Sequence, residues 1–358
     1  MFAVLMLFNG AGNIANFVAA FIAGAEIFTG NVQLLFITLG MGLTFSTGYL
    51  LMPFLAFFLR DWKSFQMAIS LPILLYLPFW WVIPESPRWL LSQGRVDEAE
   101  AIVRKAADMN KVNAPPVVFE DEMTEGLRTE KEKRYTVLDV FKTSNIRTTT
   151  MILCFLWFSV AVGYFGVTLN TSKLTHDPYL GSCISAMVEM PAYLVTWLSV
   201  KRIPRRVFIS SAMVLGGVCL LLLPAIPPSL RWLSVTLEMI GKFFVVATQN
   251  LLFAYTAEVF PTVLRNTATG VCSTWGRIGS CISPFIIQLR LYFTFLPPVV
   301  IGTLTVGSAI GALFLPETAR QPLPETIQDM QHHKRIKFPC LGRQKTTTSS
   351  IGHVETKL

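Results

Sequence analysis

Apolar runs long enough to cross a bilayer recur along most of this chain. A helix needs about 20 predominantly apolar residues to span the hydrocarbon core of a membrane, and the 358-residue sequence contains several such runs. Charged residues make up 15% of the sequence and hydrophobic residues 52%, whereas a typical soluble domain is about 25% charged. The sequence therefore predicts an all-α membrane protein and excludes a soluble globular domain.

The apolar runs fall into two groups. We expect nine spans, at residues 3–25, 33–58, 65–83, 148–169, 179–200, 207–224, 232–256, 267–288 and 296–315. Three of them precede a long polar stretch and six follow it. The predicted domains are thus three spans in 1–83, a central loop in 84–147, a six-span bundle in 148–315 and a tail in 316–358.

Basic residues indicate which side of the membrane each loop occupies. Lys and Arg gather in the central loop, in the tail and in residues 201–206, which hold four basic side chains between the fifth and sixth spans. The positive-inside rule places all three segments in the cytoplasm. Arg60 and Lys63 fit this scheme less well, but Asp61 lies between them.

The central loop contains one helical pattern. Val96, Ala99, Val103 and Ala106 repeat at helical spacing with charged residues between them. This spacing predicts an amphipathic helix that lies under the bundle. A solvated, charged helix is the alternative.

The third and ninth spans end in the same way. Pro-Glu-Ser-Pro-Arg follows the third span at 84–88, and Pro-Glu-Thr-Ala-Arg follows the ninth at 316–320. Proline stops a helix, and an acid and a base come next at the predicted cytoplasmic edge. Two six-helix halves related by such a repeat are typical of the major facilitator fold. The second group supplies a complete half of six spans, and the first supplies three.

Several motifs resemble solute carrier family 22. They are Pro-Glu-Ser-Pro-Arg-Trp-Leu at 84–90 and Ala-Glu-Val-Phe-Pro-Thr-Val-Leu-Arg-Asn at 257–266. Residues 163–166, 185–193 and 203–206 resemble more closely the organic cation/carnitine transporters of that family. The similarity extends from Met1 to about Met330. It implies a major facilitator fold of twelve spans, of which this chain would hold the last nine.

The resemblance also implies a function. It predicts a plasma-membrane carrier for small cationic or zwitterionic organic solutes such as carnitine, which works by alternating access with its site at mid-membrane. The resemblance allows sodium as a coupling ion and implies no cofactor. The alternative is a truncated isoform that does not transport and that associates with, or is degraded beside, the full-length carrier.

Other classes of protein fit the sequence poorly. An enzyme is not expected, because all four histidines lie outside the predicted spans and no nucleophile pattern occurs. No metal site is expected, because the six cysteines lack zinc-ligand spacing. Nucleic-acid binding is not expected either, because there is no basic stripe on a soluble fold. The expected partners are therefore a small organic solute and the lipid bilayer.

Ionisable residues inside spans are candidates for function, because a charge in the bilayer is costly. Arg277 lies near the middle of the eighth span, and its guanidinium is a planar fork suited to a carboxylate. The resemblance adds that family members for carboxylate-bearing substrates carry a base here. We expect Arg277 to bind substrate or to gate, with a structural ion pair as the alternative. Glu189 precedes Pro191 in the fifth span and is expected to hold a cation or to pair with Lys242 or Arg277.

Four charged residues are candidates for gating. Glu26 and Glu258 lie near predicted cytoplasmic ends at matching places in the two groups, and Glu258 with Arg265 forms a Glu-x-x-Pro-x-x-x-Arg pattern. We interpret them, with Lys242, as ion pairs that break and reform during transport. The alternatives are helix-end charges that face water and, for Lys242, a side chain that extends to the outer interface.

Aromatic residues in the spans are candidates for the cationic part of a substrate. Aromatic faces bind quaternary ammonium groups without a full negative charge, and Phe17, Trp157, Tyr164 and Tyr255 all lie in predicted spans. The alternative is that they only pack or anchor the helices.

The last residues suggest one protein partner. The chain ends in Glu-Thr-Lys-Leu at 355–358, and a carboxyl terminus of this kind is able to add a strand to a PDZ domain. A chance match is the alternative.

Overall fold

The structure is a computed structural model made of helices. It describes residues 2–28, 32, 35–76, 78, 84–85, 87, 90–91, 94–112, 115, 119, 141, 144–174, 177–200, 202–260 and 262–318. Every regular element within these residues is a helix, which agrees with the predicted all-α class. The tail from residue 319 onward lies outside the described residues, so the PDZ-binding terminus stays a prediction.

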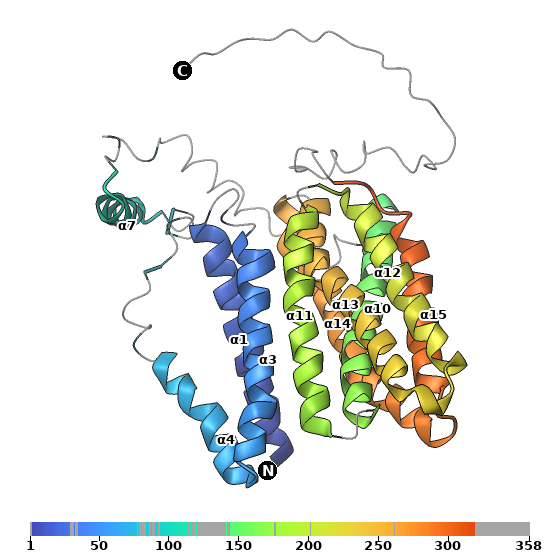
Figure 1. Cartoon of the computed structure of the whole chain (residues 1–358). Helices are drawn as coiled ribbons and strands as arrows, with labels where there is room; N and C mark the ends of the chain where they lie inside the picture. Colours follow the sequence, from blue (N-terminus) through green and yellow to red (C-terminus); the bar gives the residue numbers. More distant parts are fainter. Residues whose placement is uncertain are drawn as a thin grey trace, which may run out of the picture.

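Six helices form one bundle in the C-terminal part of the chain (Figure 1). They are α10 (Ser144–Leu174), α11 (Pro178–Val200), α12 (Arg205–Leu222), α13 (Arg231–Val259), α14 (Thr262–Gln288) and α15 (Leu296–Ala312). Helix α10 packs against α11, α13, α14 and α15, and α12 packs against α13 and α15. The main apolar core runs along these contacts.

The N-terminal helices lie beside this bundle (Figure 1). They are α1 (Phe2–Ile27), a π-helix (Phe36–Gly40) that leads into α3 (Met41–Phe58), and α4 (Trp62–Ser70). Helix α3 packs along α11 and so joins the two groups of helices. Asp61 caps α4 by accepting a hydrogen bond from the backbone amide of Ser64 at 3.3 Å.

The third predicted span is not one continuous α-helix where it is described. Helix α4 ends at Ser70 and a 3-10 helix (Leu71–Tyr76) follows. Pro72 lies at this junction and has no backbone N–H to give to an α-helical turn. The end of the predicted span, from residue 77 to 83, lies almost wholly outside the described residues.

Several described helices have the length and composition of membrane spans. The five that are long and apolar enough are Phe36–Phe58, Asn145–Thr171, Pro178–Val200, Arg205–Ala225 and Arg231–Val259, and Leu296–Ala312 is apolar but shorter. The other predicted spans correspond to α1, to α4 with its 3-10 helix, and to α14. These helices support a multi-pass membrane protein.

The central loop contains the expected amphipathic helix, α7 (Val96–Met109). Ala99 is buried against Leu90 and Leu91, and Val96 packs beside it. Helix α7 lies to one side of α1 and not under the bundle (Figure 1), which corrects the expectation from sequence. Ala106, predicted on the buried face, is exposed, because the small apolar patch covers only the first turns of α7.

Charged side chains hold the start of this helix. Arg95 donates a hydrogen bond to Glu98 at 2.7 Å and another to Glu85 at 3.2 Å. The hydrogen bonds from Arg95 lower the pKa of the Glu98 carboxyl below its ordinary value.

Glycines allow α10 and α14 to approach closely. A Cβ atom placed on Gly279 would lie 2.6 Å from the carbonyl oxygen of Phe158, and one on Gly276 would lie 3.2 Å from the Trp157 ring. Small residues at a helix contact let two backbones meet in this way. This crossing holds α14, and with it Arg277, against α10.

We expect Gly279→Ala to destabilise the bundle by about 1–3 kcal/mol, as overpacking of a tight contact does. The new methyl group meets backbone atoms, which have no rotamer through which to escape. The matched control is Gly270→Ala on the same helix, where no atom lies within 4 Å of an added Cβ. The apparent melting temperature in detergent is the measurement, and an equal change in the two variants would contradict the close contact.

Candidate functional site

A cavity of about 360 Å³ lies between the N-terminal helices and the six-helix bundle. Pockets for small ligands usually have volumes of roughly 300–1,000 Å³. Seven of its sixteen lining residues are aromatic, and the lining comes from α1, the π-helix, α3, α10, α11, α13 and α14. Its aromatic members are Phe17, Phe21, Phe45, Tyr164, Phe165, Tyr193 and Phe253, and its polar members are Asn13, Gln249, Asn250 and Arg277.

Arg277 is the charged group of this cavity. Of the described residues that line it, Arg277 alone carries a charge. Its side chain is exposed, and no described carboxylate forms an ion pair with its guanidinium. Helix α14 thus places the guanidinium of Arg277 at the cavity, beside its aromatic side chains. A carboxylate is the group that best accepts the parallel hydrogen bonds of a guanidinium.

The four predicted aromatic residues divide into two pairs. Phe17 and Tyr164 line the cavity. Trp157 lies outside the lining, where its Nε1 donates to the hydroxyl of Thr256 at 3.0 Å and its ring packs on Phe253. Tyr255 is fully buried and donates from its hydroxyl to the carbonyl oxygen of Pro316 at 2.6 Å. The structure therefore brings two of the four to the cavity and gives the other two packing contacts.

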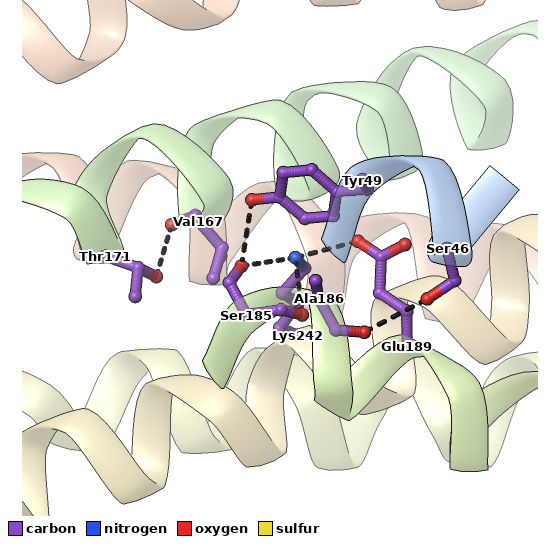
Figure 2. A network of polar contacts seen from close by, with 8 residues as sticks. All are labelled: Ser46, Tyr49, Val167, Thr171, Ser185, Ala186, Glu189 and Lys242. Atoms are coloured by element: carbon purple, nitrogen blue, oxygen red, sulfur yellow. Dashed lines mark hydrogen bonds and ion pairs between the residues drawn. The ribbon is translucent and has the colours of Figure 1, made fainter. Parts of the chain in front are cut away.

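Glu189 and Lys242 form an ion pair directly behind the cavity wall. Lys242 Nζ lies 2.8 Å from Glu189 Oε1, and both side chains are fully buried. Lys242 also donates to the hydroxyl and to the carbonyl oxygen of Ser185, as Figure 2 shows. The side chains of Tyr164 and Tyr193, which line the cavity, neighbour the Glu189 carboxylate. Of the two partners proposed for Glu189, the structure selects Lys242 and not Arg277.

Helix α3 reaches this ion pair from the N-terminal group. The hydroxyl of Tyr49 donates to Ser185 Oγ at 3.3 Å, and the hydroxyl of Ser46 donates to the carbonyl oxygen of Ala186 at 3.0 Å (Figure 2). The Lys242 ammonium lies 4.9 Å from the centre of the Tyr49 ring and 5.4 Å from that of Tyr164. The ammonium group is thus surrounded by one carboxylate, one hydroxyl and two aromatic faces.

Sequence reasoning missed Tyr49 and Ser185. A signal for Ser185 was present, because it lies four residues before Glu189 and therefore on the same face of α11. Tyr49 gave no signal, since its role depends on how α3 packs against α11.

A second buried polar cluster surrounds Glu238 on α13. Asn170 on α10 donates from Nδ2 to Glu238 Oε1 at 2.8 Å, and Arg290 donates to Asn170 Oδ1 at 3.3 Å. Glu238 is 1% exposed, and its Oε2 has no hydrogen-bond partner among the described residues. Glu238 lies four residues before Lys242, so the two side chains share a face of α13.

The predicted gate differs in its pairing. Glu258 at the end of α13 accepts from Arg205 at 3.3 Å and from the hydroxyl of Thr318 at 2.6 Å. The expected partner, Arg265, is partly buried beside Glu258 but forms no described ion pair with it. Arg205 is the cation that pairs with Glu258 in this conformation, because the N-terminus of α12 lies next to the end of α13.

The same end of the bundle carries a cap. Glu317 accepts hydrogen bonds from the backbone amides of Arg205 and Arg206, at 2.9 and 3.1 Å. A carboxylate at the first turn satisfies free amides and interacts favourably with the helix dipole. The repeated Pro-Glu motif after the ninth span therefore holds the start of α12. The side chain of Glu26, the remaining gating candidate, lies outside the described residues.

No metal site is found in the described part of the chain, where no group of three or more His, Cys, Asp or Glu side chains converges.

Comparison with known proteins identifies the family. Residues 26–330 match the family "Sugar (and other) transporter". The chain is 44% identical over 337 residues to organic cation/carnitine transporter 2 of Homo sapiens, covering 94% of this chain and 60% of that protein. It is 42% identical over 358 residues to organic cation/carnitine transporter 2 of Rattus norvegicus, covering 100% of this chain and 64% of that protein. The chain thus spans less than two thirds of the length of these curated relatives.

A solved structure supports the fold. The proton:xylose symporter XylE, described as a major facilitator superfamily protein and solved with 6-bromo-6-deoxy-D-glucose, matches with a TM-score of 0.58 at 18% identity. The match covers 85% of this chain and 68% of that one. It confirms the predicted major facilitator fold, and the family is one of transporters and not of enzymes. The chain therefore belongs to the sugar (and other) transporter family, as a multi-pass membrane protein related to the organic cation/carnitine transporters of solute carrier family 22.

Proposed function

We propose that this chain forms the substrate cavity of a plasma-membrane carrier for small organic zwitterions and cations such as carnitine. The observation that carries the proposal is the guanidinium of Arg277, which has no ion-pair partner among the described residues and lines a cavity rich in aromatic side chains. A zwitterion with a quaternary ammonium group offers a carboxylate for Arg277 and a diffuse cation for ring faces such as those of Phe17 and Tyr164. The names of the relatives, organic cation/carnitine transporter 2, point to the same class of solute.

The cavity is also in a suitable place for alternating access. Its walls come from both groups of helices, so that rocking of one group against the other would open it to each side in turn. Besides the packing of α3 along α11, hydrogen bonds cross this boundary: Asn250 donates to the carbonyl oxygen of Thr38 at 2.9 Å, and Ser46 donates to that of Ala186. We place the central loop and the tail in the cytoplasm because of their basic residues.

Carnitine binding and uptake by the 358-residue chain in proteoliposomes test the proposal. We expect saturable binding of labelled carnitine and time-dependent accumulation above that of empty liposomes. If sodium is the coupling ion, an inward sodium gradient raises the accumulation relative to an equal potassium gradient. Binding without accumulation would favour the non-transporting isoform, and the absence of both would refute the proposal.

A further inference from the structure

The surroundings of the Lys242 ammonium are those that recognise an organic ammonium group. One carboxylate, Glu189, lies 2.8 Å away, and the ring centres of Tyr49 and Tyr164 lie at 4.9 and 5.4 Å. Carboxylates and aromatic faces at such distances attract ligand cations as well as lysine. Tyr164 also lines the cavity, so one wall is shared between the cavity and this ammonium box, which we define as Tyr49, Tyr164, Ser185 and Glu189. In the conformation of Figure 2 the chain's own Lys242 fills the box.

Lys242 has a second carboxylate within reach. Glu238 lies one helical turn earlier on α13, the spacing and order at which Glu and Lys side chains meet on a helix. The two residues interact electrostatically. The lysine ammonium sits on a flexible four-carbon stem and can reorient without moving the helix.

Glu238 forms no ion pair with any described residue in this conformation, although Arg290 and Lys242 both interact with it electrostatically. Arg290 also donates to Asn170 at 3.3 Å. The hydroxyl of Thr171, which donates to the carbonyl oxygen of Val167 (Figure 2), neighbours the carboxylate as well. One carboxylate oxygen, Oε2, is buried without a hydrogen bond among the described residues. A buried charge in a membrane bundle is expected to have a partner in at least one state.

We propose that Lys242 moves between two carboxylates: it pairs with Glu189 when the ammonium box is closed, and with Glu238 when an organic ammonium group enters the box from the cavity. The inference rests on the proposed function, because it concerns the cationic part of that substrate. The Lys242 ammonium leaves Glu189 as the ammonium group of the ligand arrives. The Glu189 carboxylate therefore always has a cation beside it. Lys242 is thus an internal competitor for the ligand cation, and Glu238 is the residue that receives it.

Tetramethylammonium is a suitable probe, because it has no carboxylate and does not need Arg277. Binding of the labelled probe is measured on the purified 358-residue chain in lipid nanodiscs. Lys242→Met removes the competitor while keeping an unbranched side chain. If Lys242 fills the box nine-tenths of the time, its removal should tighten probe binding about tenfold, since apparent affinity scales with the open fraction. Unchanged or weaker binding in a folded Lys242→Met protein would overturn the proposal.

Glu238→Gln is the second variant, and it leaves the Lys242–Glu189 pair intact. We expect weaker probe binding, because the displaced ammonium has no carboxylate to receive it. In the Lys242→Met background the same change should have no effect, because no ammonium needs to be received. An equal loss in both backgrounds would mean that Glu238 acts through its charge alone, and the second position of Lys242 would be refuted.

The control is Glu100→Gln, which changes a carboxylate to an amide on α7, where Glu100 pairs with Arg104 away from the cavity. It should leave probe binding unchanged. The outcome also separates this inference from the proposed function. If the parent chain binds carnitine but Lys242→Met does not bind tetramethylammonium more tightly, only the role of Lys242 as internal competitor is refuted. If the parent chain does not bind carnitine, the carrier proposal is refuted first.

Discussion

Replacing Arg277 by alanine is expected to weaken carnitine binding about thirtyfold while leaving binding of a carboxylate-free analogue nearly unchanged. The guanidinium lines the cavity without a described acidic partner, so it is free to bind the carboxylate of a substrate. A charge-assisted, two-pronged contact is stronger than a neutral hydrogen bond, which contributes about 1 kcal/mol. Its loss should cost roughly 2 kcal/mol, which corresponds to about thirtyfold in affinity.

Two further substitutions sharpen this test. Arg277→Lys should restore binding only in part, because it keeps the charge and loses the planar fork. Arg277→Asp should be the worst for carnitine and should favour simple quaternary cations. The measurement is competition by carnitine and by the carboxylate-free analogue against a common labelled ligand, with Arg147→Ala as the control for loss of an exposed arginine. Equal losses for both ligands would assign Arg277 to the bundle or to a gate.

Much of the fold could be predicted from composition and from the ends of the helices. Apolar runs of bilayer length located the helices, because in lipid the backbone must satisfy its own hydrogen bonds. The third span was harder. Its composition is apolar up to residue 83, yet Pro72 interrupts the helix after Ser70. A hydrophobic run predicts that a segment lies in lipid, but it does not predict which kind of helix the backbone forms inside the run.

The site was only partly predictable, and the reason is geometric. Arg277 and Tyr164 could be chosen because each stands out on its own helix. The ammonium box could not be assembled from sequence, because Tyr49 belongs to another group of helices, and only the packing of α3 on α11 brings it to Ser185. Trp157 and Tyr255 show the opposite case: both look suitable on their own helices, but both lie outside the cavity lining and have hydrogen bonds to Thr256 and Pro316.

The same reasoning applies to the gating residues. The Glu-x-x-Pro-x-x-x-Arg pattern placed Glu258 and Arg265 near each other along the chain. In the structure Glu258 forms an ion pair with Arg205, because α12 begins beside the end of α13. A motif within one segment cannot reveal a competitor that comes from another helix. The pairing seen here is that of one conformation, and a gate needs at least two.

Substituting one member of the Lys242–Glu189 ion pair is expected to destabilise the bundle more than any other single substitution. Both side chains are fully buried, and the removal of one member leaves the other charge without its partner. Breaking a buried pair in this way destabilises a protein by roughly 3–5 kcal/mol. We therefore expect Glu189→Gln to lower the apparent melting temperature by about 10 °C, at 2–4 °C for each kcal/mol.

A double variant separates the lost pair from lost packing. In Glu189→Gln with Lys242→Met both charges are absent, and replacing a buried pair by neutral groups of similar size is often nearly neutral. The double variant should therefore melt close to the parent, although each single variant melts well below it. Thermal unfolding in detergent, followed by the loss of monomer in size-exclusion chromatography, provides the measurement. If the effects of the two substitutions simply add, the two charges do not stabilise each other and the pair is not a unit.

The single variant Lys242→Met allows one more comparison. It leaves the buried Glu189 carboxylate without its cation, so the chain is destabilised and its ammonium box is vacant. An added ammonium ion that enters the box should restore the missing charge. Ligand that binds only the folded state stabilises it by about 2.7 kcal/mol at a hundred times its Kd. Tetramethylammonium should thus raise the melting temperature of Lys242→Met by more than that of the parent, and an equal rise in both would show that the probe binds elsewhere.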